Sequence, residues 1–210
     1  MNLIILLSKA MITTIELFML TLLFAIPLGL VIAFGRRSKN IIISGITGIY
    51  ISVMRGTPLM LQLVVVFFAP FYIYEGKIDR FVAAIVAFTL NYAAYFAEIY
   101  RGGIDSIPKG QYEAGEVLGF SKVQIFFKII LPQVVKRILP AISNEVITLV
   151  KDTALATTIG VIEMFKVANN EQNRISSLQP LFVAGAFYYV MNLIIAQIFK
   201  LAEKKLNYYK

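Results

Sequence analysis

The stretch MITTIELFMLTLLFAIPLGLVIAF, residues Met11–Phe34, decides the fold because it is long and almost wholly apolar. A helix needs about 20 apolar residues to cross the hydrocarbon core of a bilayer, and this stretch is long enough. Glu16 is its one charged residue and Pro27 its one proline. The stretch therefore predicts a transmembrane helix.

The whole chain has the composition of an integral membrane protein. Of its 210 residues, 59% are hydrophobic and 15% are charged, and the mean hydropathy is +0.77. A soluble domain of this length is rarely so apolar. The chain contains no cysteine and no histidine. These absences exclude disulfides, thiol nucleophiles and histidine-based metal sites, and they disfavour a membrane-embedded enzyme.

Four further apolar stretches lead to a prediction of an all-α membrane protein with five transmembrane helices in a single domain. The fourth helix is short, and it contains Asn144 and Glu145. A weaker apolar stretch, Ile41–Met54, could lie in the membrane interface or extend the second span inward. The predicted spans are residues 11–34, 58–74, 81–100, 138–150 and 181–201.

The distribution of Lys and Arg predicts the orientation, because cytoplasmic loops near spans are rich in these residues. With the N-terminus outside and the C-terminus inside, 14 of the 20 basic residues lie on the cytoplasmic side. The net charge of +8 then belongs to the cytoplasmic face of a membrane protein, and it does not indicate binding to nucleic acid. The outer side holds Lys9, Lys77, Arg80, Lys151, Lys166 and Arg174.

The third predicted span and its flanks carry packing and polar residues with local roles. Asn91 and Tyr92 favour hydrogen bonds between helices over substrate contact. Glu98 and Arg101 lie three residues apart, which predicts an ion pair on one helix face. Arg55 could anchor the inner end of the second span in the lipid headgroups, which is the favoured reading, or it could contact a neighbouring cytoplasmic loop. Alanines at helical spacing predict close approach of another helix; they are Ala83, Ala87, Ala94 and Ala97.

The longest cytoplasmic connection contains the stretch EAGEVLGFSKVQIFFKIILPQ, Glu113–Gln133. Ser106 and Pro108 are typical of a helix start, and Gly119 suits a helix end in the left-handed conformation. The pattern predicts a short helix over residues 109–118. Such a helix could dock a soluble partner, and it could equally be an ordinary solvated surface helix.

This stretch resembles the cytoplasmic signature of importer-type ABC transporter permeases, E-A-A, three residues, G, nine residues, I-x-L-P. Glu113 and Ala114 match, Gly115 replaces the second alanine, and Gly119 follows at the expected distance. The last part of the signature is matched by Ile129, Leu131 and Pro132. The stretches RGTPLMLQL and KDTALATTIG are similar to the polar amino-acid branch of that family. The resemblance covers the chain from about Thr13 to its C-terminus.

The resemblance implies partners and roles. Helix 109–118 would be the coupling helix, seated in a separate ATP-hydrolysing subunit. Glu113 and Ala114 would contact that subunit, and Gly119 would permit a sharp exit. The chain has no G-x-x-x-x-G-K-[ST] phosphate loop, so ATP would be bound by the partner, and this chain would be neither an enzyme nor a cofactor-binding protein. The family pairs two permease chains, identical or similar, with two ATPases and an extracytoplasmic solute-binding protein, in the bacterial inner membrane.

The segment of residues 152–166 is a candidate cavity lining, because it is apolar yet rich in Thr and Ala and broken by Gly160. Carboxylates within or beside spans are costly and hence candidates for function. The candidate substrate-binding residues are Asp152, Glu163, Thr153 and Thr157.

Two acidic groups favour a cationic amino acid such as arginine, lysine or histidine as the substrate, moved by alternating access. A neutral polar amino acid such as glutamine is the alternative. Asp152 and Glu163 could instead be structural, as a helix cap and a group at the outer water interface. An ATP-independent carrier or channel is the rival class, and it would have no use for the docking helix.

Overall fold

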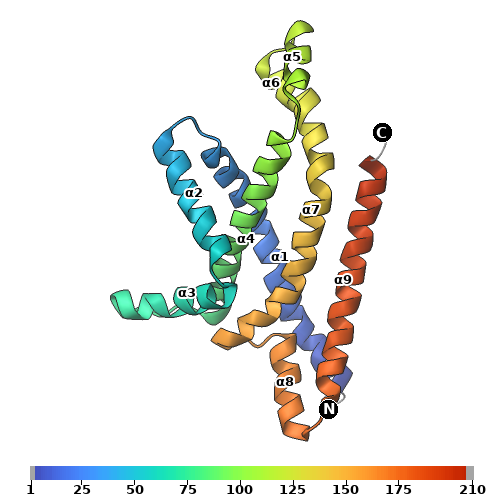
Figure 1. Ribbon diagram of the computed structural model, residues 1–210. Helices are drawn as coiled ribbons and strands as arrows, with labels where there is room; N and C mark the ends of the chain where they lie inside the picture. Colours follow the sequence, from blue (N-terminus) through green and yellow to red (C-terminus); the bar gives the residue numbers. More distant parts are fainter. Residues whose placement is uncertain (1–2, 207–210) are drawn as a thin grey trace.

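The computed structural model describes residues 3–206, and every regular element in that range is a helix (Figure 1). The elements in chain order are α1 (Leu3–Arg36), α2 (Ile41–Gly56), α3 (Leu59–Tyr74), α4 (Arg80–Asp105), α5 (Lys109–Val117), α6 (Lys122–Ile125), the π-helical η1 (Phe126–Ile130), α7 (Leu131–Asp152), the 3₁₀-helical η2 (Thr153–Ile159), α8 (Met164–Ile175) and α9 (Gln179–Leu206).

The long helices share one axis. Helices α1, α4 and α9 run along it in one direction, and α2 and α7 run back in the other (Figure 1). Helices α5 and α6 form a tip where α4 ends and α7 begins, and α9 finishes toward that tip. Since α1 begins at the opposite end, the described chain starts and finishes on opposite sides of the bundle.

Helix length and hydropathy support only part of the five-span prediction. Helices α1, α4 and α9 are long and apolar enough to cross a membrane, and a fourth span is gained if α2 and α3 count as one bent span. Helix α7 falls short because Lys136, Arg137 and Glu145 lie within one membrane length of each other. The predicted fourth span, residues 138–150, covers the C-terminal part of this longer helix.

A break between α2 and α3 redirects the chain by 111°. Pro58 disfavours the helical conformation at Thr57, which is extended with φ −118° and ψ 148°. Helix α3 therefore lies across the bundle axis, whereas α2 runs along α4 (Figure 1). The predicted second span, residues 58–74, thus falls on the transverse helix. The weaker stretch Ile41–Met54 supplies the helix that runs along the axis.

The core forms where α1 meets α4. Gly29 of α1 has no space for a side chain, since an added Cβ would lie 2.8 Å from the Cβ of Phe96 and 3.0 Å from the carbonyl oxygen of Ala93. The predicted alanines of α4 are all buried there, namely Ala83, Ala87, Ala94 and Ala97. The prediction that small residues let another helix approach α4 is therefore confirmed.

Elements α6, η1 and α7 follow one another without a break in the chain. Ser121 starts them with a capping box, in which its hydroxyl accepts from the Gln124 amide and the Gln124 side chain accepts from the Ser121 amide. Pro132 cannot donate a backbone hydrogen bond, and the preceding residues widen into a π-turn closed by the Leu131 amide and the Phe126 carbonyl. The tip is thus continuous with the helix that leads to Asp152.

Candidate transport site

Asp152 is the last residue of α7, and it faces α4. The Tyr92 hydroxyl donates a hydrogen bond of 2.7 Å to Asp152 Oδ2. Tyr92 is 2% exposed, whereas Asp152 is half-buried and retains an accessible side. Tyr92 thereby fixes one carboxylate oxygen and leaves the rest of the group for another partner.

Thr153 and Thr157 lie on η2, the short helix that follows Asp152. Thr153 is fully buried, and its hydroxyl donates to the Val150 carbonyl at 2.7 Å. Thr157 is partly exposed. Gly160 ends η2 with φ +83°, a conformation that favours glycine. Of the two threonines, Thr157 is the one with an accessible side chain.

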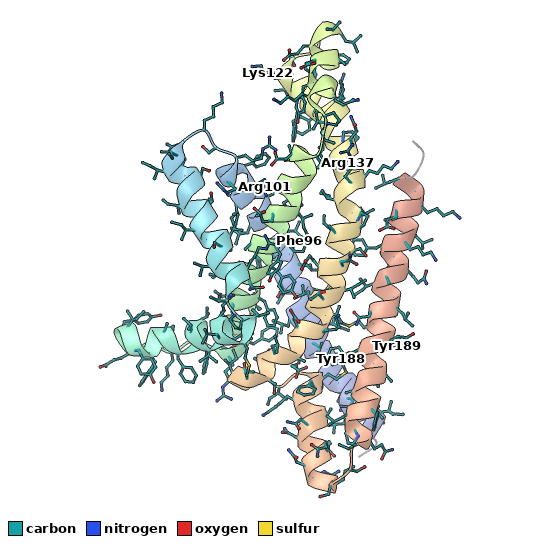
Figure 2. All side chains as sticks on the ribbon, in the orientation of Figure 1. Phe96, Arg101, Lys122, Arg137, Tyr188 and Tyr189 are labelled. Carbon is teal, nitrogen blue, oxygen red and sulfur yellow. The ribbon has the colours of Figure 1, made fainter. Side chains whose placement is uncertain are left out.

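Glu163 has a different environment from Asp152. It is fully buried as the N-cap of α8, where its carboxylate accepts from the Phe165 amide at 2.7 Å and the Lys166 amide at 2.6 Å. The Tyr188 hydroxyl donates to the same carboxylate at 2.9 Å. Figure 2 shows Tyr188 directed from α9 toward the bundle. The carboxylate joins α8 to α9, and the structure does not bring it into contact with Asp152.

Further polar side chains extend from Asp152 along α7. Glu145, Thr148 and Asp152 are spaced so that they share one helix face, and each is half-buried. On α4, a second row of polar side chains follows at three-residue spacing, namely Tyr92, Tyr95 and Glu98. Contacts of Asp152 with Tyr92 and of Arg137 with the Ser106 carbonyl fix the antiparallel register.

In this register Glu98 and Glu145 lie at about the same level along the two helices. We name the two rows, Tyr92, Tyr95 and Glu98 with Glu145, Thr148 and Asp152, the α4/α7 polar face. Closer to the tip, an open pocket of about 370 Å³ lies between α4 and α7. Its lining includes Glu98, Gly102, Ser106, Arg137 and Ala141. The polar face therefore continues into a pocket toward the tip.

A chain of ion pairs surrounds Glu98. The Arg101 guanidinium donates to both carboxylate oxygens of Glu98 at 3.0 and 2.8 Å, which confirms the predicted pair. Arg101 also pairs with Asp105 at 3.0 Å, and Asp105 pairs at 2.7 Å with Arg37, which directly follows α1. Figure 2 shows Arg101 on the part of α4 nearer the tip.

The structure places the Arg55 guanidinium beside two residues of α4. Its guanidinium lies 3.7 Å from Glu98 and 5.3 Å from the centre of the Tyr95 ring. The reason is that α2 runs along α4, so the last turn of α2 faces the polar row of α4. Nothing in the periodicity of residues 41–56 revealed this contact.

Asn91 acts between helices, as predicted. Its side-chain amide donates to the Met54 carbonyl and to the side-chain oxygen of Gln62, both at 3.0 Å. Gln62 in turn donates to the Met54 carbonyl and to the carbonyl and hydroxyl of Thr57. The two amides satisfy carbonyls left unpaired by the break before Pro58. Tyr92 was also predicted to form a hydrogen bond between helices, and its hydroxyl donates from α4 to Asp152 of α7.

The tip carries the residues of the expected docking helix. Helix α5 spans Lys109–Val117, and Glu113 and Ala114 are exposed on it. Gly119 has φ +76°, so its predicted left-handed conformation is confirmed. The Gly119 and Phe120 amides donate to the Glu116 and Gly115 carbonyls, the pattern of a Schellman helix end.

Gly115 stands where the signature has its second alanine, and packing explains the glycine. It is buried on α5, and an added Cβ would lie 2.7 Å from Ile125 Cγ1. The exposed face of the tip is partly apolar, since Val117 is 89% exposed and Leu118 is 70% exposed. Exposed apolar side chains beside Glu113 are typical of a protein interface.

The opposite end of the molecule presents the charged helix α8. Arg174 donates hydrogen bonds of 2.9 and 2.7 Å to Glu171, and these lower the pKa of the Glu171 carboxyl below its ordinary value. In the described part of the chain, no group of three or more acidic side chains could hold a metal ion.

Comparison with known proteins identifies the family. Residues 25–208 match the model of the family described as binding-protein-dependent transport system inner membrane component. The arginine transport system permease protein ArtQ of Bacillus subtilis (strain 168) is 40% identical over 195 residues, which cover 92% of this chain and 89% of that protein. The permease protein GlnP of Rickettsia bellii (strain RML369-C), named for glutamine transport, is 35% identical over 199 residues with the same coverage.

A solved structure supports the same assignment. One chain in a crystal structure of an amino acid ABC transporter with histidines superimposes with a TM-score of 0.88 and 32% identity, covering 95% of this chain and 94% of that one. The chain therefore belongs to the binding-protein-dependent inner membrane permeases of ABC importers, in the branch whose members named above are amino-acid transporters.

Proposed function

We propose that this permease carries a cationic amino acid, arginine, lysine or histidine, into the cytoplasm. The observation that supports this cargo is the α4/α7 polar face, where Asp152 and Glu145 are half-buried carboxylates with accessible sides. A cationic side chain of the cargo would pair with Asp152, and Thr157 would bind its carboxylate. The relative from B. subtilis is named for arginine transport.

The other two candidate cargo-binding residues, Glu163 and Thr153, already form hydrogen bonds within the permease. The Glu163 carboxylate already accepts three hydrogen bonds, and the Thr153 hydroxyl is bonded to Val150. Cargo contact at these residues stays a prediction, and it requires the cap of α8 or the start of η2 to open.

A neutral polar amino acid is the second candidate cargo. The relative from R. bellii is named for glutamine transport, and the Tyr92 hydroxyl together with Asp152 could bind a side-chain amide as well as a cation. The two cargoes differ in what they require of Asp152. A cation needs its charge, whereas an amide needs only a hydrogen-bond acceptor.

The transport cycle would use the two ends of the molecule. We place α1, α2, α4, α7 and α9 across the membrane, with the N-terminus outside and the tip in the cytoplasm. This assignment rests on their shared axis and on the Lys and Arg of the tip side. Two permease chains, identical in the simplest assembly, would form the path between them.

Coupling to ATP would occur at the tip. Helix α5 would sit in a groove of the ATPase subunit, with Glu113 paired to a basic residue there and Ala114 packed against its wall. ATP binding would draw the two α5 helices together and open the permease outward, where a solute-binding protein delivers the cargo. Hydrolysis would restore the inward-open state.

Binding of radiolabelled arginine, histidine, glutamine and glutamate to the purified permease with its ATPase subunit tests the cargo. We expect arginine or histidine to bind and Asp152→Asn to weaken that binding at least tenfold, since the loss of a close charge pair at this half-buried site should cost at least about 1.4 kcal/mol. Glu16→Gln is the matched control, because it removes an exposed carboxylate of α1. Glutamine binding that survives Asp152→Asn would establish the neutral cargo instead.

A further inference from the structure

Arg55 lies beside the α4/α7 polar face, along which a cationic cargo would move. It belongs to the last turn of α2, directly before the break that turns the chain by 111°. Its guanidinium lies over the Tyr95 ring at 5.3 Å and near Glu98 at 3.7 Å. Tyr95 and Glu98 are members of the α4/α7 polar face, one and two helical turns closer to the tip than Tyr92. Arg55 therefore lies between the Asp152 site and the pocket toward the tip.

The two arginines on Glu98 are held differently. Arg101 makes two hydrogen bonds to Glu98 and another to Asp105. Arg55 approaches Glu98 only as an ion pair without a hydrogen bond, and its side chain is 44% exposed. Because Arg101 keeps Glu98 satisfied, Arg55 can leave without exposing a bare buried carboxylate. Of the two arginines beside Glu98, Arg55 is thus the one that another cation can replace.

Glu145 gives the position a second carboxylate. It lies on α7 at about the level of Glu98 in the α4/α7 register. Within residues 3–206 it forms no ion pair. A carboxylate and an aromatic ring around one guanidinium, here Glu98 and Tyr95, are the surroundings that a cationic side chain prefers. Glu145 adds a further negative charge on the neighbouring helix α7.

We propose that Arg55 is a resident cation of the inner half of the transport path, and that the cationic side chain of the cargo displaces it from Tyr95 and Glu98 on the way to the cytoplasm. The proposal rests on the cationic cargo proposed above. While the path is empty, Arg55 helps to balance the charge of the Glu98 carboxylate. When cargo passes, Arg55 competes with it, which weakens binding on the inner side and promotes release.

The place of Arg55 beside the break gives it a way to move. Gly56 follows it, and an added Cβ at Gly56 would meet no atom within 4 Å. The carbonyls of the break are held by the side chains of Asn91 and Gln62, and the Arg55 guanidinium takes no part in those hydrogen bonds. Movement of the Arg55 side chain from Glu98 therefore breaks none of them.

The test compares equilibrium binding of arginine and of glutamine to the nucleotide-free complex of the permease with its ATPase subunit. We expect Arg55→Gln to tighten arginine binding about three- to fivefold, the range of a partly exposed ion pair, and to leave glutamine binding unchanged. Arg37→Gln is the matched control, because Arg37 pairs with Asp105 and contacts neither Glu98 nor Tyr95. Arg55→Lys keeps the charge and should bind arginine as the wild type does.

A double-mutant cycle with Glu145→Gln tests the same idea by another route. The gain from Arg55→Gln should shrink when Glu145 has lost its charge. Arginine binding that is unchanged in Arg55→Gln, or a change that Arg37→Gln reproduces, overturns the proposal. Failure of the cargo assignment has a different signature, since the wild type would then bind no cationic amino acid or Asp152→Asn would bind arginine normally.

Discussion

At the scale of single residues, two carboxylates close in sequence have different surroundings. Asp152 has one bonded neighbour, the Tyr92 hydroxyl, and an accessible side. Glu163 is fully buried and accepts from two backbone amides and from Tyr188. A carboxylate with all its acceptors engaged favours a structural role, and one with a free side favours ligand binding.

Replacing Glu163 by glutamine should therefore lower stability. The amide keeps one acceptor but loses the charge that strengthens the cap and the bond from Tyr188, at a cost of about 1–2 kcal/mol. Thermal unfolding of the detergent-purified permease measures it, with a midpoint lower by about 2–4 °C for each kcal/mol. Glu16→Gln is the control, and equal midpoints for the two variants would contradict a structural role for Glu163.

At the scale of elements, the backbone conformation at the end of α5 sets the orientation of this proposed docking helix. Gly119 adopts φ +76°, and its amide and that of Phe120 close the last turn. A β-branched residue is strained in this conformation by about 1–2 kcal/mol, whereas asparagine tolerates it. The exit from α5 thus depends on backbone conformation more than on any side chain.

Gly119→Val should reduce stimulation of the ATPase while leaving membrane insertion intact, because it reorients α5 without touching the spans. Gly119→Asn should retain most of the stimulation. The measurement is ATP hydrolysis by the reconstituted complex with and without loaded binding protein. Full stimulation in Gly119→Val would show that docking tolerates another exit from the helix.

At the scale of the whole molecule, local features could be predicted and contacts between distant residues could not. The Glu98 and Arg101 pair and the conformation of Gly119 depend on spacing within one segment. The Tyr92 and Asp152 bond joins residues 60 positions apart, and Arg55 meets Glu98 through the register of α2 on α4. Pro58 signals a break, but its residue type does not set the angle of 111°.

The proposed topology can be tested on the intact chain, which has no cysteine of its own. A cysteine at Lys77, in the connection from α3 to α4, should react with a membrane-impermeant maleimide added to spheroplasts. A cysteine at Lys122, at the tip, should react only after permeabilisation (Figure 2). The unmodified chain is the control, and the reverse labelling pattern would invert the orientation.

The packing of α1 against α4 also bears on how the protein is made. Gly29 contacts Phe96 and Ala93, and the chain must form α2 and α3 before that surface exists. During synthesis, α1 therefore has no helix packed against Gly29 until α4 has been made. The buried Thr14 hydroxyl lacks its partner for longer, because it accepts from the Met164 amide at the start of α8. A nascent chain that stops before α4 therefore leaves α1 without either of these contacts.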